Sequence, residues 1–336
     1  MLLSICIPTY NRPIHLENCL NSICIAKKNA KKFKFEVCIS DNGSKHDIKK
    51  IVFKYQQKIK IKFHRFKRNY GITTNFLKTI EMAKGEFVWT IGNDDLLVPK
   101  SLLIIQKLLK KFKKADYFFI NSSNLGYDYL EKFETPFDTK NLPKKMVKFS
   151  NYPSESKFLK FWELINPKTS EDFLLGMFFS LFRKKNWDNN LQVLNKKNFK
   201  DRRWMSTFDN TCFNVKIFAQ AFKNSYAYYC SKPLSVNLSG VREWHKLYPF
   251  IVIVRFPEIL DEYKKAGMSR WRYYYCKNYV FKDFINYFSL IILKGKDYGR
   301  NYINYKKHIF KNLLYPNVYL SIIYYFFRKS KNLITK

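Results

Sequence analysis

Residues 4–12 read SICIPTYNR, and this stretch decides the fold class that we expect. The apolar run over residues 3–7 predicts a short buried strand, which Pro8 ends before the polar residues that follow. Outward from this strand, the first 120 residues alternate β-branched or aromatic runs with amphipathic stretches. Such alternation is typical of strand–helix units, so we expect an α/β protein with a mostly parallel sheet flanked by helices.

The strands and helices of this first part follow from the period of the apolar residues. Strands are predicted at 3–7, 35–40, 61–64, 87–91 and 117–120, and helices at 13–25, 47–55, 73–83 and 100–111. Right-handed crossovers bring the carboxyl ends of parallel strands to one edge of a sheet, where open α/β sheets bind ligands. The residues at this edge are therefore the candidate site.

The rest of the chain is expected to complete the sheet and then to become helical. The pattern predicts an irregular connection at 121–150, a buried strand at 174–183, a helix at 208–222, short strands at 226–230 and 233–237, and main helices at 271–293 and 302–327.

Composition narrows the class of protein and of partner. With 336 residues, of which 46% are hydrophobic, the chain is too apolar for a disordered tail. Its 62 Lys and Arg against 26 Asp and Glu give a net charge of +36, which favours anionic partners such as phosphorylated small molecules, nucleic acid or an acidic membrane. An AT-rich coding bias would produce the same Lys, Asn, Ile, Phe and Tyr excess, so we expect no specific nucleic-acid binding.

Absent motifs exclude further classes. Seven scattered cysteines without a C-x-x-C pair predict neither a disulfide framework nor a zinc site, and they suit a reducing compartment. The N-terminus lacks the basic start of a signal peptide, so we expect a cytoplasmic protein. The sequence has no G-x-x-x-x-G-K-[ST], G-x-G-x-x-G, H-E-x-x-H or G-x-S-x-G motif, which argues against P-loop enzymes, dinucleotide oxidoreductases, zincins and α/β-hydrolases.

The C-terminal stretch is basic and aromatic. Residues 269–336 hold fourteen Lys or Arg and two acidic residues. The longest charge-free run, 312–327, is interrupted by Pro316 and is shorter than the ~20 apolar residues of a bilayer span. Flanked by Lys311 and Arg328, it suits the headgroup layer of an anionic membrane, at the inner face of the cell membrane. A cap of helices packed on the domain explains the same pattern, and both interpretations stay open.

Polar residues follow four of the predicted strands. Thr9 and Tyr10 can offer backbone contacts and a stacking face to a nucleotide, and Asp41 can accept hydrogen bonds from a base or ribose. Arg12 and Arg68 can bind a diphosphate. The motifs are PTYNR at 8–12, SDNGS at 40–44, RNYG at 68–71 and GNDD at 92–95.

Two adjacent acids stand at the last of these strand ends. Asp94 and Asp95 offer hard oxygen ligands, which suit Mg²⁺ or Mn²⁺ carried in with a diphosphate. Each motif alone also fits ordinary turn and cap chemistry. The set as a whole, each member after a predicted strand, favours a nucleotide site.

These motifs, in this order, resemble those of family 2 glycosyltransferases of the GT-A fold. The resemblance is carried by SICIPTYNR at 4–12, SDNGS at 40–44, AKGEF at 83–87 and NDD at 93–95. It implies two abutting βαβ units that bind a nucleoside-diphosphate sugar and transfer the sugar with inversion. It also implies a GT-A domain over 1–240, with a nucleotide-sugar-binding half at 1–120 and an acceptor half at 121–240, followed by a basic aromatic helical region at 241–336.

The resemblance assigns site residues by their place in the motifs. Thr9, Tyr10 and Asp41 would hold the nucleoside, and Asp95 would be the metal ligand of an Asp-x-Asp-type site. Asn93 stands where many relatives have Asp, which removes one charge from that site. The full donor-binding set is Pro8, Thr9, Tyr10, Arg12, Asp41, Arg68, Asn69 and Asp94.

An inverting transfer needs a general base, which the family places at the start of a helix in the second half. The segment FDNTCFN at 208–214 resembles that position, so Asp209 is the expected base, with Phe208 where relatives often have Glu. A cap or first-turn acid that interacts with the helix dipole explains Asp209 as well. Asp201 and the pair Glu171–Asp172 are reserve candidates.

The acceptor is expected to be a saccharide of a surface glycan or a lipid-linked saccharide. Trp204, Arg242, Trp244 and His245 could shape its pocket or serve in packing. The Gln-x-x-Arg-Trp motif of processive relatives is missing, which predicts transfer of a single sugar. The alternatives are a non-catalytic basic protein that binds an anionic membrane or nucleic acid, and a degenerate glycosyltransferase that binds donor without turnover. A sugar-phosphate nucleotidylyltransferase is disfavoured because the Gly-rich, Arg-containing first loop is missing.

Overall fold

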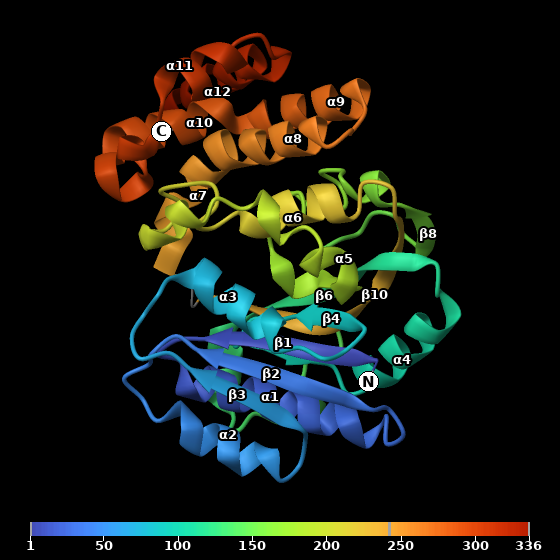
Figure 1. Cartoon of the computed structure of the whole chain (residues 1–336). Coiled ribbons are helices and arrows are strands. Elements are labelled where there is room, and N and C mark those ends of the chain that lie inside the picture. Colours follow the sequence, from blue (N-terminus) through green and yellow to red (C-terminus); the bar gives the residue numbers. More distant parts are fainter. Residues whose placement is uncertain (1, 241–242, 335–336) are drawn as a thin grey trace.

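Within residues 2–240 and 243–334, which the computed structural model describes, a ten-stranded sheet carries helices on both faces, and a layer of further helices lies beyond one face (Figure 1). The strands are β1 (Leu3–Thr9), β2 (Phe35–Asp41), β3 (Ile61–Arg65), β4 (Phe87–Thr90), β5 (Asp95–Leu97), β6 (Ala115–Gly126), β7 (Val147–Lys148), β8 (Lys157–Lys160), β9 (Ser180–Arg183) and β10 (Tyr226–Ser239).

The helices alternate with these strands and then follow them. The α-helices are α1 (Pro13–Lys28), α2 (Ile48–Gln56), α3 (Ile72–Glu81), α4 (Ser101–Lys111), α5 (Lys184–Asp188), α6 (Phe213–Ala221), α7 (Tyr248–Phe250), α8 (Phe256–Lys265), α9 (Arg270–Val280), α10 (Phe284–Lys294), α11 (Tyr305–His308) and α12 (Pro316–Ile334). A π-helical stretch, η8 (Ile251–Arg255), joins α7 to α8, and the 3₁₀ turns η9 (Phe281–Asp283) and η12 (Phe310–Asn312) lie between the later helices.

The first half of the sheet has the predicted topology. Strands β3, β2, β1 and β4 lie side by side and are all parallel. Side chains alternate along β1, so that Ile5 and Ile7 join a core that contains Leu16 of α1, whereas Cys6 joins a core that contains Ile80 of α3. This alternation explains why helices are needed on both faces of the sheet.

The second half of the sheet is mixed, whereas the parallel arrangement expected from the first 120 residues is confirmed for β1 to β4. β9 pairs antiparallel with both β4 and β6, and β10 pairs parallel with β6 but antiparallel with β5 and β8. β6 continues to Gly126, so the segment expected to be irregular from residue 121 begins as strand. β10 is one strand with an irregular register between Cys230 and Ser235, where two strands were predicted.

Two further predictions are wrong at their N-terminal ends. Only 180–183 of the strand predicted at 174–183 is extended, because Phe173 and Leu174 have positive φ and a short 3₁₀ turn follows. The helix predicted at 208–222 begins at Phe213.

The C-terminal helices form a layer beyond α6, on one side of the sheet (Figure 1). Phe250, Ile259 and Phe284 share one buried core with Phe218 of α6. The helix predicted at 271–293 is divided by η9, and the one predicted at 302–327 is divided by η12. The interpretation as a packed cap is therefore correct for α7 to α10. Among the described residues, no helix combines the length and the apolar character needed to cross a bilayer.

Candidate active site

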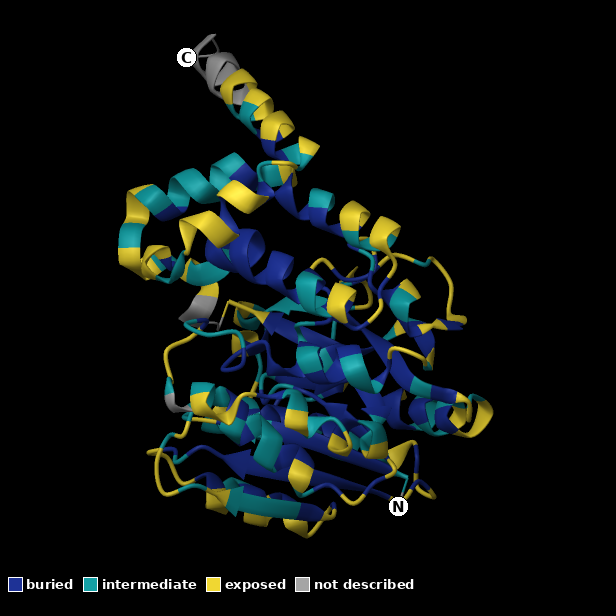
Figure 2. Cartoon of the chain, turned by 45° about the horizontal axis from the view of Figure 1, so that its top comes forward, coloured by how far each residue is buried: buried dark blue, intermediate teal, exposed yellow. Residues whose placement is uncertain are grey.

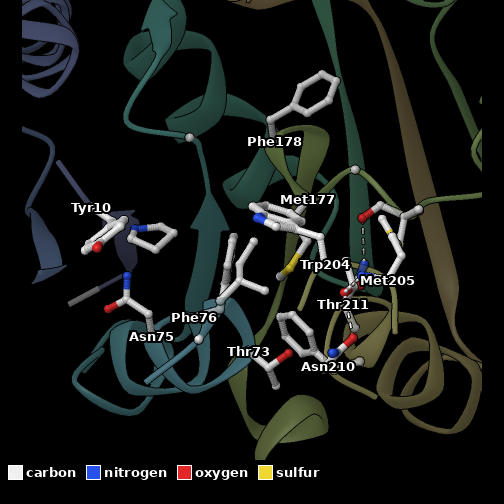
Figure 3. A pocket seen from close by; sticks show the side chains of 18 of the residues that line it. Tyr10, Thr73, Asn75, Phe76, Met177, Phe178, Trp204, Met205, Asn210 and Thr211 are labelled. Carbon is white, nitrogen blue, oxygen red and sulfur yellow. Dashed lines mark hydrogen bonds between the residues drawn. The ribbon is translucent and has the colours of Figure 1, made fainter. Parts of the chain in front are cut away.

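A cavity of about 600 Å³ lies at the carboxyl edge of β1 and β4. Its lining joins these strand ends to the start of α3, the turn at 171–178, the loop at 199–214, and the segment of α7 and η8. Figure 3 shows Tyr10 and Asn75 at one side of this cavity and Trp204 and Met177 toward the other, with Phe76 between them. The predicted site residues that it brings together are Pro8, Thr9, Tyr10, Arg12, Asn69, Asp94 and Asp95.

Asparagine side chains hold the loops at the Tyr10 end in place. Asn75 Nδ2 donates to the Thr9 carbonyl oxygen at 3.2 Å, and Asn93 Nδ2 donates to Thr9 Oγ1 at 2.8 Å. Asn42 Nδ2 donates to Asn69 Oδ1 at 2.9 Å. These amides fix the backbone after β1 without adding charge, which leaves the charge of this end to Arg12 and the two acids. The sequence analysis missed Asn42 and Asn75 because an amide carries no signal of its own.

Asp41 and Arg68 are not among the residues that line the cavity, and their predicted contacts to a donor stay a prediction. The fully buried Asp41 carboxylate accepts from Ser44 N and Ser44 Oγ and pairs with Arg65 Nε at 3.4 Å. The Arg68 guanidinium lies over the Tyr70 ring, 5.2 Å from its centroid. Asp41 therefore builds the turn, and its neighbour Asn42 reaches the cavity instead, as does Tyr70.

Asp94 and Asp95 both line the cavity. Asp94 Oδ2 lies 3.2 Å from Arg12 Nη1. Asp95 accepts from Gly92 N at 2.6 Å and from Asn237 Nδ2 at 2.8 Å. In the part of the chain that the structure describes, no group of three or more His, Cys, Asp or Glu gathers as a metal cluster. Two carboxylates nevertheless fit a hard cation that takes its other ligands from a diphosphate and water.

Asp209 also lies outside the cavity lining. Its fully buried carboxylate pairs with Lys216 Nζ at 2.6 Å and accepts from Asn195 N at 3.0 Å. Because α6 starts at Phe213, Asp209 is neither its N-cap nor in its first turn. Its carbonyl oxygen accepts from Thr73 Oγ1 at 3.2 Å. Asp209 therefore ties its loop to α6 and α3.

The three reserve acids do line the cavity. Asp201 forms a two-point ion pair with Arg203, and the hydrogen bond from Arg203 holds the pKa of the Asp201 carboxyl well below its usual value. Glu171 is mostly exposed and lies 3.7 Å from Lys282 Nζ. Asp172 accepts from Gly176 N at 2.8 Å and from Ser170 Oγ. These two hydrogen bonds fix the orientation of the Asp172 carboxylate.

The turn that carries Asp172 is strained. Phe173 and Leu174, both fully buried, have φ of 52° and 68°, a region that side-chain-bearing residues rarely adopt. Asn214 Nδ2 donates to the Leu174 carbonyl oxygen at 3.0 Å, and Tyr263 OH donates to that of Phe173 at 2.8 Å. Strained backbone that is held in place by surrounding hydrogen bonds is frequent at functional sites. This turn places Asp172 at the cavity.

The far end of the cavity is aromatic. Trp204 lines it, as predicted, together with Phe149, Phe178 and Tyr248, which the sequence analysis missed. His245 is exposed and lies outside the lining. Arg242 and the side chain of Trp244 lie outside the described residues. The missed residues come from segments far apart in the chain, so no local pattern could connect them.

Comparison with known proteins gives three findings. The model of the family described as Glycosyl transferase family 2 matches residues 4–188, more than half of the chain. The abequosyltransferase RfbV of Salmonella typhimurium is 38% identical over 135 residues, which cover 39% of this chain and 39% of that protein. The poly(ribitol-phosphate) beta-N-acetylglucosaminyltransferase TarS of Staphylococcus aureus is 32% identical over 103 residues, or 30% of this chain and 18% of TarS.

The structural likeness extends further along the chain than the sequence likeness. A crystal structure of a TarS fragment in complex with UDP-GlcNAc matches with a TM-score of 0.57 and 18% identity, over 85% of this chain and 72% of that fragment. At this identity the likeness concerns the fold alone. The aligned segments span less than half the length of the curated relatives that match the sequence.

Proposed function

The chain belongs to glycosyl transferase family 2 and has its GT-A fold, and from this premise we propose that it transfers one sugar from a nucleoside-diphosphate sugar to a hydroxyl of a saccharide acceptor. The observation that carries the proposal is the cavity, which connects the Tyr10 end, with Asp94 and Asp95, to an aromatic end with acids of its own. Donor and acceptor would meet between these ends.

The donor would occupy the Tyr10 end. The partly exposed Tyr10 ring offers a stacking face to a base, and Asn42 and Asn69 offer hydrogen bonds to the nucleoside. Arg12 would bring its positive charge to the diphosphate. Asp94 and Asp95 would hold Mg²⁺ or Mn²⁺, which when bound neutralises charge on a leaving diphosphate.

We assign the general base to Asp172 in place of Asp209. Asp172 lines the cavity on a strained, hydrogen-bonded turn, whereas Asp209 is buried against Lys216. The Asp172 carboxylate would accept the proton of the acceptor hydroxyl, whose oxygen would attack the anomeric carbon as the bond to the diphosphate breaks. Asp201 is the poorer base because its pair with Arg203 lowers its pKa.

The acceptor is proposed to be a saccharide, free or lipid-linked, of a surface glycan. The aromatic side chains at the far end, Trp204 and Phe178 among them, suit stacking on sugar rings. We further propose that residues 1–120 serve the donor, residues 121–240 the acceptor, and that the helical region follows at 241–336.

Donor binding is tested by thermal shift with UDP, GDP, CDP, dTDP and ADP, each with and without Mn²⁺. A ligand that binds only the folded state raises the melting temperature. We expect stabilisation by one nucleotide, dependent on metal and lost in Asp95→Ala. No shift with any nucleotide would overturn the proposal and favour a binder driven by charge, and a shift without turnover on any acceptor would indicate a degenerate transferase.

The base is tested by Asp172→Asn and Asp209→Asn. For Asp172→Asn we expect an unchanged nucleotide shift and a loss of transfer of about 10²- to 10⁴-fold. For Asp209→Asn we expect a lower melting temperature, because Lys216 loses its partner. The opposite pattern, with stable Asp209→Asn inactive and Asp172→Asn active, would return the role to Asp209.

A further inference from the structure

Much of α12 is exposed (Figure 2), and the exposed side chains of α12 and of the turn before it are largely apolar. Leu314 is 86% exposed, Ile323 63% and Phe327 67%. With their exposed neighbours they form what we call the apolar strip. The strip consists of Phe310, Leu314, Tyr319, Leu320, Ile323, Tyr324, Phe326 and Phe327.

The opposite face of α12 is anchored to the rest of the protein. Val318 is fully buried, and Ser321 Oγ accepts from Ile285 N of α10 at 3.2 Å. Asn317 makes two hydrogen bonds to Asn278 of α9, at 3.0 and 2.8 Å. A surface helix ordinarily turns its apolar side inward and its polar side outward. Because these contacts fix α12 the other way round, its apolar side faces outward.

The positive charge around the apolar strip indicates which kind of partner binds there. No acidic residue follows Asp297, whereas eight Lys or Arg do. Lys306 and Lys311 lie exposed just before α12. A second copy of this chain would bring the same positive charge, on a protein whose net charge is +36, so like-charge repulsion opposes self-association. Aromatic and aliphatic side chains beside Lys match helices that lie in the interface of anionic bilayers.

From this combination we infer that α12 docks the protein on an anionic lipid surface, with the apolar strip in the headgroup and acyl boundary. Lys306 and Lys311 then face lipid phosphates. At about 1.5 Å per residue, a helix of 19 residues lies along about 28 Å of surface, so the whole strip can make contact at once.

The docking face connects to the acceptor end of the cavity through one helix. Tyr248, which lines the cavity, packs on Tyr287 of α10 with 6.1 Å between ring centroids. α10 in turn holds α12 through Ile285 and Ser321. If the proposed function holds, this arrangement favours an acceptor whose lipid anchor lies in the same membrane, although the docking does not depend on it.

The test is flotation of the full chain with vesicles of phosphatidylcholine, with or without phosphatidylglycerol. We expect binding to the anionic vesicles only, weaker in high salt. The double variant Ile323→Ser/Phe327→Ser should lower binding about tenfold or more, because it removes apolar surface from the lipid contact. Lys306→Glu/Lys311→Glu should also lower it. The matched control is Phe53→Ser on α2, which removes a side chain of 65% exposure and should bind as the wild type.

Each other outcome overturns the docking. Recovery in the soluble fraction with both kinds of vesicle would do so, as would binding that survives the strip variant. A dimer in light scattering that the strip variant dissociates, without vesicle binding, would assign the strip to a second copy. The nucleotide thermal shift, measured on the same preparations, reports both the folding of each variant and the proposed function, so the two proposals can fail separately.

Discussion

The strands β1 to β4 and the helix α12 use the same residue types in opposite ways. In the strands, Ile5 and Trp89 are buried in the core on one face of the sheet, and Val88 is buried in the core on the other. In α12, Ile323 and Phe327 point away from the protein. Both regions belong to one chain with one compositional bias, so the bias alone does not explain the position of the aromatic residues. What differs is the anchoring, because β2 and β4 bury all their side chains in a sheet covered on both faces, whereas α12 is held by one face.

The largest expected effect is on the free energy of unfolding, when one aromatic residue of each region is replaced by Ala. Trp89 is fully buried, and its Nε1 donates to the Phe178 carbonyl oxygen at 3.3 Å. Trp89→Ala should lower the free energy of unfolding by about 3–5 kcal/mol. Phe327→Ala should change it by no more than about 0.5 kcal/mol. Urea denaturation measures both. A cost of several kcal/mol for Phe327→Ala would mean that the strip is already covered in solution.

A buried charge cluster, as well as apolar packing, holds the C-terminal helices. Glu258 of α8 pairs with Arg255 and Lys307, and its Oε1 lies 3.2 Å from His308 Nε2. Arg255 also donates to the Met205 carbonyl oxygen in the cavity loop. Burial alone would raise the pKa of Glu258, but the hydrogen bond from His308 and the charges of Arg255 and Lys307 outweigh it and hold the pKa well below its usual value.

Glu258→Gln should therefore cost about 3 kcal/mol, because it leaves Arg255 buried without its carboxylate. A lowered folded-state pKa gives stability that is full above the unfolded-state pKa, near 4.3, and is lost as the pH falls below it. The difference between wild type and Glu258→Gln should be constant above about pH 5 and shrink in more acidic solution. Denaturation curves from neutral to acidic pH measure it. A difference that grows on acidification would contradict this assignment.

The first 120 residues were largely predictable because their signals are local. The spacing of apolar residues within each short segment predicts β1 to β4 and α1 to α4, and turn residues separate the segments. The structure confirms these elements. β9 and the extension of β6 depend on strands that come from far along the chain. Pairing with such partners, and not the local sequence, decided where the strand predicted at 174–183 began.

The site was predictable as a location and less so as a set of side chains. The motif SDNGS lies at the edge of the sheet that carries the cavity, where Asn42 lines the cavity and the Asp41 carboxylate accepts from the hydroxyl of Ser44. Asp209 has the sequence position of a base, but Lys216, one helical turn into α6, holds its carboxylate. Such choices depend on which partner lies nearest after folding, and the motif does not contain that information.

Two glycines, Gly43 after β2 and Gly295 after α10, allow a comparison of how much a side chain costs at a position of positive φ. Gly43 (φ 75°) and Gly295 (φ 72°) have nearly the same positive φ. A Cβ on Gly43 would lie 2.6 Å from the Arg68 carbonyl carbon, whereas one on Gly295 would meet nothing within 4 Å. Gly295→Ala should cost about 1 kcal/mol for the backbone angle. Gly43→Ala should cost about 1–3 kcal/mol and also weaken the nucleotide thermal shift. Equal costs for the two variants would mean that the turn at Gly43 adjusts.

The smallest effect is expected where the donor half meets the cavity loop. Arg202 Nη1 donates to the Asn69 carbonyl oxygen at 2.8 Å, and both residues line the cavity. Because this contact is exposed, Arg202→Ala should change the free energy of unfolding by no more than about 0.5 kcal/mol. It should raise the dissociation constant of the nucleotide by about two- to fivefold, since a hydrogen bond of this kind contributes about 0.5–1 kcal/mol.

Lys197→Ala is the matched control for Arg202→Ala, because Lys197 is an exposed cation just before the loop at 199–214 and lies outside the cavity lining. It removes the same charge, so any change common to both variants reports the general attraction of a basic protein for a nucleotide. Titration calorimetry at two salt concentrations separates the contribution of the Arg202 contact from the general electrostatic attraction for the nucleotide. A loss of affinity for Arg202→Ala alone, insensitive to salt, would mean that the contact between the two regions shapes the donor site. Equal losses that vanish at high salt would mean that the two regions act independently.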